Sequence, residues 1–491
     1  MSEHLPVLQV VIPLLCAPLA LLVRREAAVR TLAFAAAAAS FAISVALLVS
    51  VLADGPISYP LGGWYPPLGI EYRVDTLSAF VLCVVSGVAA VLLPLGPGRG
   101  GHGLPSGRLH WFYAALLLAQ AGLLGVTITG DLFNVFVFLE ISSLASYVLV
   151  GLGSDRRALR AAFTYLVMGT IGGTFVLIGI GFAYQMTGTL NLDDLAQRLP
   201  EVRHKSTMLA AFAFLSVGVS LKLAVFPLHQ WLPNAYAYAP PVVSAFLAAT
   251  ATKVAYYLLA RLVFTVFGVA YVFGELGLGW LLFPLSLAAI FAGALAAIRQ
   301  TDVKKLLAYS SVSQIGYLTL GLSFASLSGL TGGLVHLFNH ALTKGGLFLA
   351  VACVVARSGS SRLDDWRGIG RRMPWTMAAF VAGGLGLIGV PGTAGFVSKW
   401  YLVQAALEAG RAELALGILA SSLLAVVYVW RVVETAYFRD PGGPETRAEA
   451  PLSLLGPTWV LIGASLYFGV FTEWSAGVAS KAAAMLLGVG P

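Results

Sequence analysis

Apolar segments of roughly twenty residues recur along the chain and restrict its fold more than any other feature. Clear examples cover residues 7–23, 32–52, 111–129 and 452–471. A helix of about 20 residues crosses the hydrocarbon layer of a bilayer. Because 58% of the 491 residues are hydrophobic and 11% are charged, no soluble domain is expected beside these segments. The segments therefore predict an all-α polytopic membrane protein of about 14 transmembrane helices.

Cysteine usage and the start of the chain add two expectations. Cys16, Cys83 and Cys353 lie inside apolar segments without the spacing of metal ligands, so we interpret them as packing residues. The first apolar segment follows an acidic leader that contains a histidine, and no small-residue cleavage site follows it. It is predicted to be a retained first helix rather than a signal peptide.

The basic residues sort by loop, and this explains the formal net charge of +8 without a nucleic-acid partner. By the positive-inside rule, the odd-numbered connections between fourteen spans are cytoplasmic and both termini lie on the outer face. The odd-numbered connections hold Arg24, Arg25, Arg30, Arg99, Arg108, Arg156, Arg157, Arg160, Arg299, Lys304, Lys305, Arg357, Arg362, Arg367, Arg371, Arg372, Arg431, Arg439 and Arg447. The even-numbered connections and the C-terminus hold Arg73, Arg198, Arg203, Lys205, Arg261, Arg411 and Lys481.

Five ionisable residues lie within the apolar segments: Glu140, Lys222, Lys253, Lys344 and Lys399. A charged side chain at the bilayer centre costs about 2.5–3.5 kcal/mol on insertion scales, and such residues are functional candidates by default. Their number indicates a polar interior within the helix bundle.

Glu140 and Lys222 are the first two of these residues along the chain. Glu140 lies about 13 Å along the fifth predicted span, close to mid-membrane. A structural ion pair that locks two helices is the alternative reading. In the seventh span Lys222 is followed by Pro227, which is predicted to interrupt the helix. His229 would share a face with Lys222 in an undistorted helix, and a cap at the helix break is its alternative role.

The eighth and eleventh spans carry further basic groups. Lys253 follows Pro240 and Pro241 by about three helical turns. His336, His340 and Lys344 are spaced by four, which stacks them on one helix face and suits a relay. For Lys344, a side chain that snorkels to the cytoplasmic interface is the alternative.

A second interruption is predicted in the twelfth span. Gly389, Pro391 and Gly392 precede Lys399 there. The two interrupted spans each carry a lysine and lie five spans apart, so the chain crosses the membrane in opposite directions in them, as inverted repeats require.

Lysine, carboxylate and histidine in one buried row suit proton transfer. Burial disfavours the charged form of a lysine, whereas a nearby carboxylate favours it. If the distance between Glu140 and Lys222 changes, Lys222 would hold and release a proton in turn, and the histidines could carry it onward. The sequence contains no Cys ligand set, glycine-rich nucleotide turn or haem motif, so no metal, cofactor or site for covalent catalysis is expected.

Four stretches together resemble the antiporter-like subunits shared by Mrp cation/proton antiporters, respiratory complex I and membrane-bound hydrogenases: residues 138–143, 221–235, 301–316 and 336–345. The resemblance covers nearly the whole chain. It implies fourteen helices, two inverted five-helix repeats, broken helices 7 and 12, and a proton path along a central hydrophilic axis. By motif position it makes Glu140 and Lys222 the coupled pair, Lys253 the next station, His336 and His340 the link between halves, and Lys399 the end of the path.

The resemblance also implies how the chain divides. Residues 1–110 would hold helices 1–3, residues 111–265 the first inverted repeat with helices 4–8, residues 266–440 the second with helices 9–13, and residues 441–491 helix 14.

Two features are similar to the D-type subunits of Mrp antiporters: the tract from Gly62 to Asp75, and lysine at position 399, where the M-type subunit of complex I usually has glutamate. Gln314 departs from the histidine that complex I relatives often have. The long lateral helix of the L-type subunit is not expected. Some hydrogenase and formate-linked subunits share these features.

Three hypotheses follow. The first is a subunit of a sodium/proton antiporter that works with other antiporter subunits in a bacterial or archaeal cell membrane. The second is a proton-pumping subunit of a redox complex, with the redox centres on neighbouring subunits. The third is a scaffold that conducts nothing and would tolerate leucine or methionine at Lys222 and Lys399.

Overall fold

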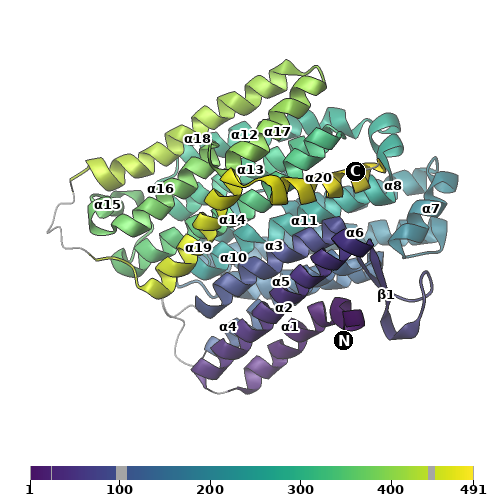
Figure 1. Ribbon diagram of the computed structural model, residues 1–491, viewed down its shortest axis with the longest axis horizontal. Coiled ribbons are helices and arrows are strands. Elements are labelled where there is room, and N and C mark those ends of the chain that lie inside the picture. The colour runs from purple at the N-terminus through teal and green to yellow at the C-terminus, as the bar shows by residue number, and fades with distance from the viewer. Residues whose placement is uncertain (1, 24, 96–107, 441–447, 490–491) are drawn as a thin grey trace.

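The computed structural model describes residues 2–23, 25–95, 108–440 and 448–489. Long helices run side by side in one bundle (Figure 1). Among the described residues, twelve helices are long and apolar enough to cross a membrane. The predicted polytopic helical fold is therefore confirmed, whereas the basic residues Arg24, Arg99 and Arg447 of the predicted loops lie outside the described residues.

The twelve candidate spans account for most of the bundle. They are α1 (Leu5–Leu22), α2 (Glu26–Asp54), α3 (Thr76–Leu92) with the 3-10 turn Leu93–Leu95, α4 (Leu109–Ile128), α5 (Leu132–Gly151), α6 (Arg157–Thr187), α8 (Ser206–Leu223), the run of α10 (Pro241–Ala249), α11 (Ala251–Ala260) and the π-helical segment Arg261–Val266, α12 (Leu278–Ile298), α14 (Leu327–Ser358), α18 (Ala412–Phe438) and α19 (Leu452–Val470).

Shorter or more polar elements fill the remainder. They are β1 (Ile57–Pro60), β2 (Glu71–Val74), α7 (Leu192–Val202), α9 (Leu232–Tyr238), α13 (Val303–Ser323), α15 (Ile369–Arg372), α16 (Pro374–Ile388), α17 (Ala394–Glu408), α20 (Glu473–Leu487), the 3-10 turns Ser2–His4, Leu61–Gly63 and Leu363–Trp366, and the π-helical segment Ala270–Glu275.

Local sequence signals fix many helix ends. The side chains of Asp131, Asp302 and Ser326 each accept a hydrogen bond from a backbone N–H in the first turn of α5, α13 and α14. Gly188 and Gly359 adopt the left-handed conformation that ends α6 and α14. These helices therefore begin and end where their capping residues place them.

A short hairpin departs from the predicted all-α fold. Strands β1 and β2 pair in antiparallel register, with Ile57 opposite Val74 and Tyr59 opposite Tyr72. The backbone N–H of Gly130, between α4 and α5, donates to the Glu71 carbonyl at 3.0 Å. The hairpin is thereby fastened to the ends of two spans, and its four-residue strands are too short to stand out in a mostly apolar sequence.

Two spans are interrupted where the sequence predicts. After α8, Ala224 adopts a left-handed conformation, and helix resumes at Leu232 in α9, on the far side of Pro227. After α16, Gly389 has φ +85°, and α17 begins at Ala394. Both predicted helix breaks are therefore confirmed.

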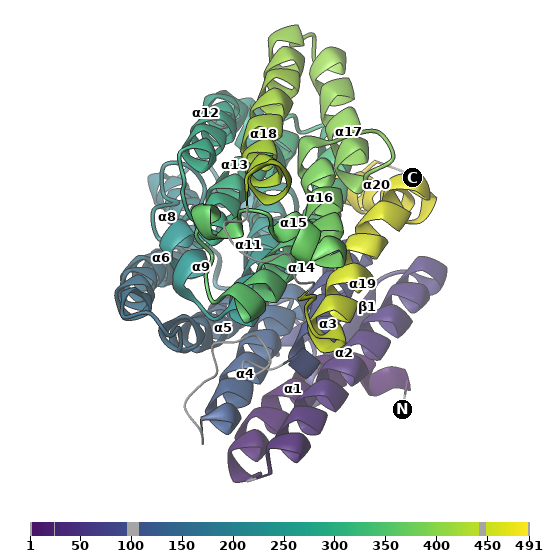
Figure 2. The same ribbon diagram turned by 90° about the vertical axis from the view of Figure 1, so that its left-hand side faces the viewer.

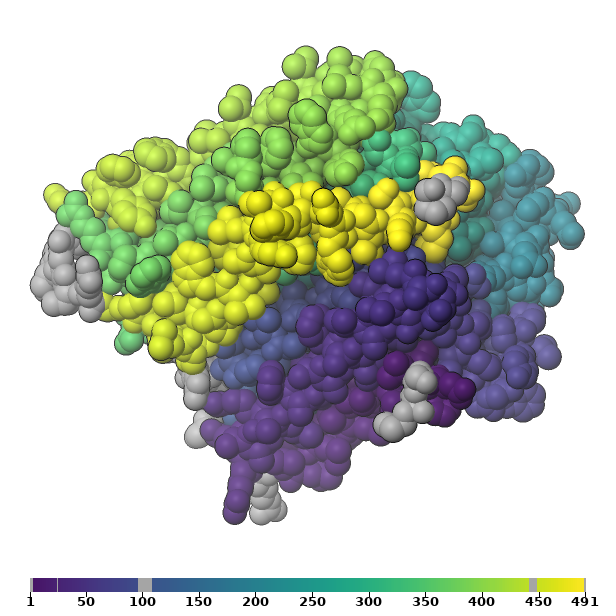
Figure 3. All heavy atoms as spheres, viewed as in Figure 1, coloured from purple at the N-terminus to yellow at the C-terminus, as the bar shows by residue number. Residues whose placement is uncertain are grey.

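Helix α14 forms the centre of the bundle. It packs against α10, α13, α16, α17 and α19, and lies near the middle of the end-on view (Figure 2). The last helix, α20, packs on both α3 and α14. In the space-filling view α19 and α20 form a continuous yellow band between the first helices and α16–α18 (Figure 3). The C-terminal helix α20 thus connects α3, from the N-terminal part of the chain, with the central helix α14.

Candidate functional site

Glu140 and Lys222 form a direct ion pair. The Lys222 Nζ lies 3.0 Å from Glu140 Oε1 and also donates to Ser143 Oγ at 2.8 Å. The lysine side chain is 8% exposed and the glutamate 24%. Glycine at 173 allows this geometry, because a Cβ there would lie 2.3 Å from Glu140 Oε1. The structure therefore brings together the two residues that the sequence predicted as a pair.

A small cavity lies beside Lys222 and opens toward α11. Its volume is about 30 Å³, and its polar lining comes from Lys222, Ser142, Ser143, Ser146 and Tyr165. On the other side it is bounded by the α11 residues Ala251, Val254 and Ala255. A volume of this size and polarity suits one or two water molecules, since about 10–15 Å³ is enough for one. Lys222 therefore has, besides Glu140, a small polar space large enough for water on the side that faces α11.

Lys253 lies at a helix break that the sequence did not predict. At Thr250 the backbone leaves helical geometry (φ −124°, ψ −57°), which separates α10 from α11. The Ala248 carbonyl accepts a hydrogen bond from Lys253 Nζ, and the Leu247 carbonyl accepts one from the Tyr236 hydroxyl at 3.1 Å. Because the end of a helix carries partial negative charge, the broken end holds the fully buried ammonium group.

The signal for this break is weak in the sequence. The Thr250 hydroxyl donates back to the Phe246 carbonyl at 2.7 Å, a contact known to bend helices. Threonine makes the same contact in many unbroken helices, so the residue type alone could not place the interruption.

Lys399 occupies the same kind of position at the second predicted break. Its Nζ donates to the carbonyls of Leu387 and Ile388 at the end of α16, at 3.1 and 2.8 Å. It also donates to Ser422 Oγ in α18 at 2.9 Å. Both Lys253 and Lys399 thus bind the carbonyl end of an interrupted helix, where the partial negative charge stabilises an ammonium group.

The predicted row on α14 is present. The rings of His336 and His340 stack with centroids 5.7 Å apart and planes inclined by 9°. His336 Nδ1 lies 2.9 Å from Ser398 Oγ, one residue before Lys399. Nε2 of His336 and both ring nitrogens of His340 have no hydrogen-bond partner within the described part of the chain. The histidines therefore extend toward Lys399 with free proton-accepting positions.

Lys344 points inward, so the snorkelling alternative is wrong. Its side chain is fully buried, and its Nζ donates to the Leu307 carbonyl at 2.8 Å and to Ser310 Oγ in α13. A carbonyl and a hydroxyl of the neighbouring helix satisfy the ammonium group, so it has no need to reach the membrane surface.

His229 is separated from the shared face that an undistorted helix would give it. It lies between α8 and α9, beyond the left-handed Ala224, and its ring stacks on Phe226 at 5.2 Å. Within the described residues no hydrogen bond joins it to Lys222, and its Nδ1 has no partner. The break that the sequence predicted is the reason that the predicted alignment is lost.

Two basic residues assigned to loops are buried in helices instead. Lys304 lies in the first turn of α13, is 6% exposed, and donates from Nζ to the Ala239 carbonyl at the end of α9 at 2.5 Å. Lys304 also borders a pocket of about 690 Å³ that is lined by Arg108, Asp155, Arg157, Asp302 and Arg362 among others. The position two residues after the capping Asp302 was the available signal that Lys304 is helical.

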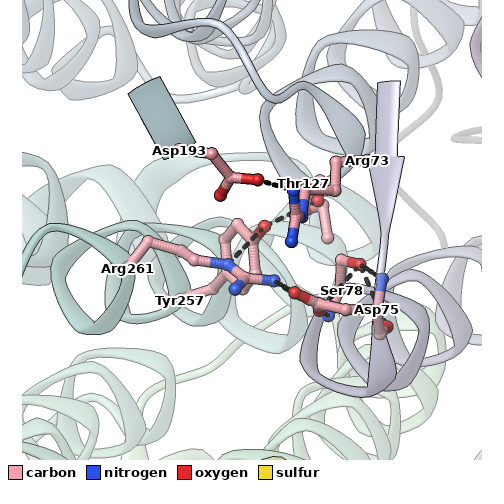
Figure 4. A network of polar contacts seen from close by, with 7 residues as sticks. All are labelled: Arg73, Asp75, Ser78, Thr127, Asp193, Tyr257 and Arg261. Carbon is pink, nitrogen blue, oxygen red and sulfur yellow. Dashed lines mark hydrogen bonds and ion pairs between the residues drawn. The ribbon is translucent and has the colours of Figure 1, made fainter. Parts of the chain in front are cut away.

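Arg261 is the second of these residues, and it joins the π-helical segment after α11 to Asp75, the residue that caps α3 (Figure 4). Its guanidinium pairs with the Asp75 carboxylate, and its Nε donates to the Tyr257 hydroxyl at 3.1 Å. The Tyr257 hydroxyl in turn donates to the Thr127 carbonyl at 2.8 Å. Burial raises the pKa of Asp75, but Arg261 and the hydrogen bonds from Ser78 outweigh it and hold that pKa below its ordinary value.

Removal of the Asp75 carboxylate is expected to destabilise the protein strongly. Asp75→Ala leaves Arg261 buried without its counter-charge, which costs about 3–5 kcal/mol. The detergent-solubilised protein should unfold at a clearly lower temperature in a fluorescence melting experiment. Arg73→Ala is the matched control, because the Arg73–Asp193 pair is partly exposed to solvent, and exposed pairs contribute about 0–1 kcal/mol. Equal melting of Asp75→Ala and wild type would contradict this role of the pair.

A family model matches most of the central part of the chain. Residues 129–425 match the family described as NADH:quinone oxidoreductase/Mrp antiporter, TM. This range includes α5, the three helix breaks and every residue of the candidate path from Glu140 to Lys399.

Similar proteins cover almost the full chain. NADH-quinone oxidoreductase subunit N of Desulforudis audaxviator (strain MP104C) is 42% identical over 96% of this chain and 97% of its own length. The D-type subunit of the Na(+)/H(+) antiporter of Bacillus subtilis (strain 168) is 30% identical over 98% of this chain and 97% of its own length. A chain in the structure of the Mrp complex from Dietzia sp. DQ12-45-1b superposes with a TM-score of 0.90 and 26% identity, over 99% of this chain and 97% of that one.

Proposed function

Because the chain belongs to the NADH:quinone oxidoreductase/Mrp antiporter transmembrane family, we propose that it is the proton-translocating subunit of a multi-subunit Mrp-type cation/proton antiporter. Proteins of this family are membrane subunits of antiporters or of complex I. The proposal places this subunit in a bacterial or archaeal cell membrane, where it works with other antiporter subunits and exchanges protons for sodium.

The observation that carries the proposal is the buried row of basic groups that follows the Glu140–Lys222 pair. We assign the path to Glu140, Lys222, His229, Lys253, His336, His340, Lys344 and Lys399. Each lysine in this row is held by a carboxylate, a carbonyl or a hydroxyl. Such partners stabilise the charged form, and a change in their distance lets the lysine release a proton.

The first transfer would occur at Lys222. With Glu140 at 3.0 Å, the lysine is held in its charged form. When the carboxylate withdraws, the ammonium group loses its counter-charge in a buried site and releases its proton into the cavity that faces α11. Lys253, beyond that cavity on α11, receives the proton, and the α14 histidines pass it to Lys399.

We propose that the chain crosses the membrane fourteen times. Adding α13 and the interrupted pair α16 and α17 to the twelve long apolar helices gives this number. Both termini then lie outside, residues 111–265 and 266–440 form the two inverted repeats, residues 1–110 precede them and residues 441–491 follow. The lysines at the two predicted breaks, Lys222 and Lys399, occupy corresponding places in the two halves.

The second candidate function is a proton-pumping subunit of a redox complex. It is favoured by the 42% identity to a protein named as an NADH-quinone oxidoreductase subunit, against 30% for the Bacillus subtilis antiporter protein. The D-type features, lysine at 399 and the tract 62–75, favour the antiporter.

Transport by inverted membrane vesicles from cells that carry the complete gene cluster separates these functions. The vesicles are energised, a pH-sensitive dye is quenched, and sodium is then added. For the antiporter we expect sodium-dependent dequenching that is missing from vesicles without this subunit. A complex that ignores sodium and acidifies vesicles when an electron donor is oxidised would instead establish the redox pump.

A further inference from the structure

Within the described residues, no hydrogen bond joins Lys344 or Lys399 to the histidines that lie between them. Lys344 donates to Ser310 in α13 rather than to His340. Lys399 donates to Ser422 in α18, and its Nζ lies 4.9 Å from the centre of the Tyr317 ring. Lys344 thus contacts α13 and Lys399 contacts α18, and Tyr317 of α13 lies between Lys399 and the His336 ring, 5.4 Å from the centre of that ring.

Tyr428 lies in the interface between α13 and α18. It belongs to α18, its side chain is 1% exposed, and its hydroxyl has no hydrogen-bond partner among the described residues. Ser310 and Tyr317 lie two helical turns apart on one face of α13, and Ser421 and Tyr428 lie two turns apart on one face of α18. The hydrogen bond between Tyr317 and Ser421 joins these two faces, where Ser310 and Tyr317 interact with the Tyr428 hydroxyl. Ser310 is the group that Lys344 contacts, so the Tyr428 hydroxyl lies one step beyond Lys344.

Tyr317 continues the sequence of hydroxyls toward Lys399. The Tyr317 hydroxyl hydrogen-bonds to Ser421 Oγ, and Ser422 is the next residue of α18. Ser422 Oγ accepts from Lys399 Nζ at 2.9 Å. Tyr317, Ser421 and Ser310 are buried like Tyr428, so this set of hydroxyls is shielded from the membrane.

We propose that Tyr428 bridges a second proton route between Lys344 and Lys399, parallel to the histidine row. The route runs through hydroxyls in the order Ser310, Tyr428, Tyr317 and Ser422, along the faces of α13 and α18 that the bond between Tyr317 and Ser421 joins. Each hydroxyl oxygen accepts a proton on a lone pair and releases its own O–H proton to the next oxygen, so nothing is oxidised or reduced. The proposal rests on the function proposed above.

The unpartnered hydroxyl distinguishes Tyr428 from a residue that only fills space. A buried tyrosine hydroxyl usually finds a hydrogen-bond partner, and phenylalanine would occupy the same volume without a polar atom. The Tyr428 hydroxyl has no contact among the described residues that meets hydrogen-bond geometry. It is therefore suited to a bridge that a small side-chain rotation or one water molecule completes.

The test compares Tyr428→Phe with Tyr437→Phe in the complete antiporter complex. Tyr437 lies on the same helix but contacts Gly370 of α15, away from the route. Loss of one hydrogen-bonding group should slow sodium-driven proton transport per assembled complex by about two- to tenfold in Tyr428→Phe, and leave Tyr437→Phe at the wild-type rate.

A double variant tests whether the two routes are parallel. If they are, combining Tyr428→Phe with His336→Gln should slow transport by more than the product of the two single effects. Wild-type transport in Tyr428→Phe, together with no added loss in the double variant, would overturn the second route. If Tyr428→Phe fails to assemble, Tyr317→Phe decides by the same criteria. Should Lys222→Ala transport normally, the proposed function itself fails, whatever Tyr428 does.

Discussion

Replacing Lys222 with alanine is expected to abolish proton transport while the complex still assembles. The substitution removes the only basic group that contacts Glu140 among the described residues, and with it the step at which a proton is held and released. Proton transfer by a positioned side chain contributes about 10²–10⁴-fold to a rate. We therefore expect the initial rate of sodium-dependent dequenching, per assembled complex, to fall by at least about a hundredfold.

Arginine at the same position separates a proton carrier from a structural ion pair. Lys222→Arg keeps a positive charge beside Glu140, but an arginine does not release its proton in proteins. A structural pair would be restored by arginine, whereas a proton station would remain inactive. Lys205→Ala is the control for loss of a lysine, because Lys205 is exposed at the start of α8. Full transport by Lys222→Arg would show that charge alone is needed.

The helix breaks show which parts of the fold could be predicted from the sequence and which could not. Pro227 and the tract from Gly389 to Gly392 interrupt helices because proline and glycine act on the backbone directly. At the break at Thr250, the Thr250 hydroxyl, the Tyr236 hydroxyl and the Lys253 ammonium group donate to three successive carbonyls, those of residues 246, 247 and 248. These contacts are close in the sequence, but threonine and lysine also occur in unbroken helices, so the residue types alone do not place the break.

The same distinction applies to the charged residues. Spacing by four placed His336, His340 and Lys344 on one face of α14, because that rule is local to one helix. Whether Lys344 reaches the interface or turns inward depends on Leu307 and Ser310 of another helix. Arg261 was assigned to a loop by charge sorting for the same reason, since its partner Asp75 is distant in the sequence.

Substitution of Lys399 by methionine is expected to stop proton transport at the far end of the row. Methionine fills a similar volume without an ionisable group, so His336 would have no basic group beyond Ser398 to receive the proton. By the same range for a positioned proton-transfer group, transport should fall by at least about a hundredfold. We would measure it as sodium-driven pH change inside proteoliposomes that contain the purified complex.

Loss of transport in this variant has a structural explanation that must be separated from the chemical one. The Lys399 ammonium group binds the last carbonyls of α16, so methionine leaves the Leu387 and Ile388 carbonyls unpaired beside the break. Lys399→Arg retains donors for these carbonyls but does not release a proton. An assembled Lys399→Arg complex that cannot transport would assign the defect to proton release, whereas transport at the wild-type rate would make Lys399 a cap for the interrupted helix. Lys253 binds a broken helix end in the same way. Wild-type transport by Lys399→Arg would therefore indicate that Lys253, too, caps its helix and does not carry a proton.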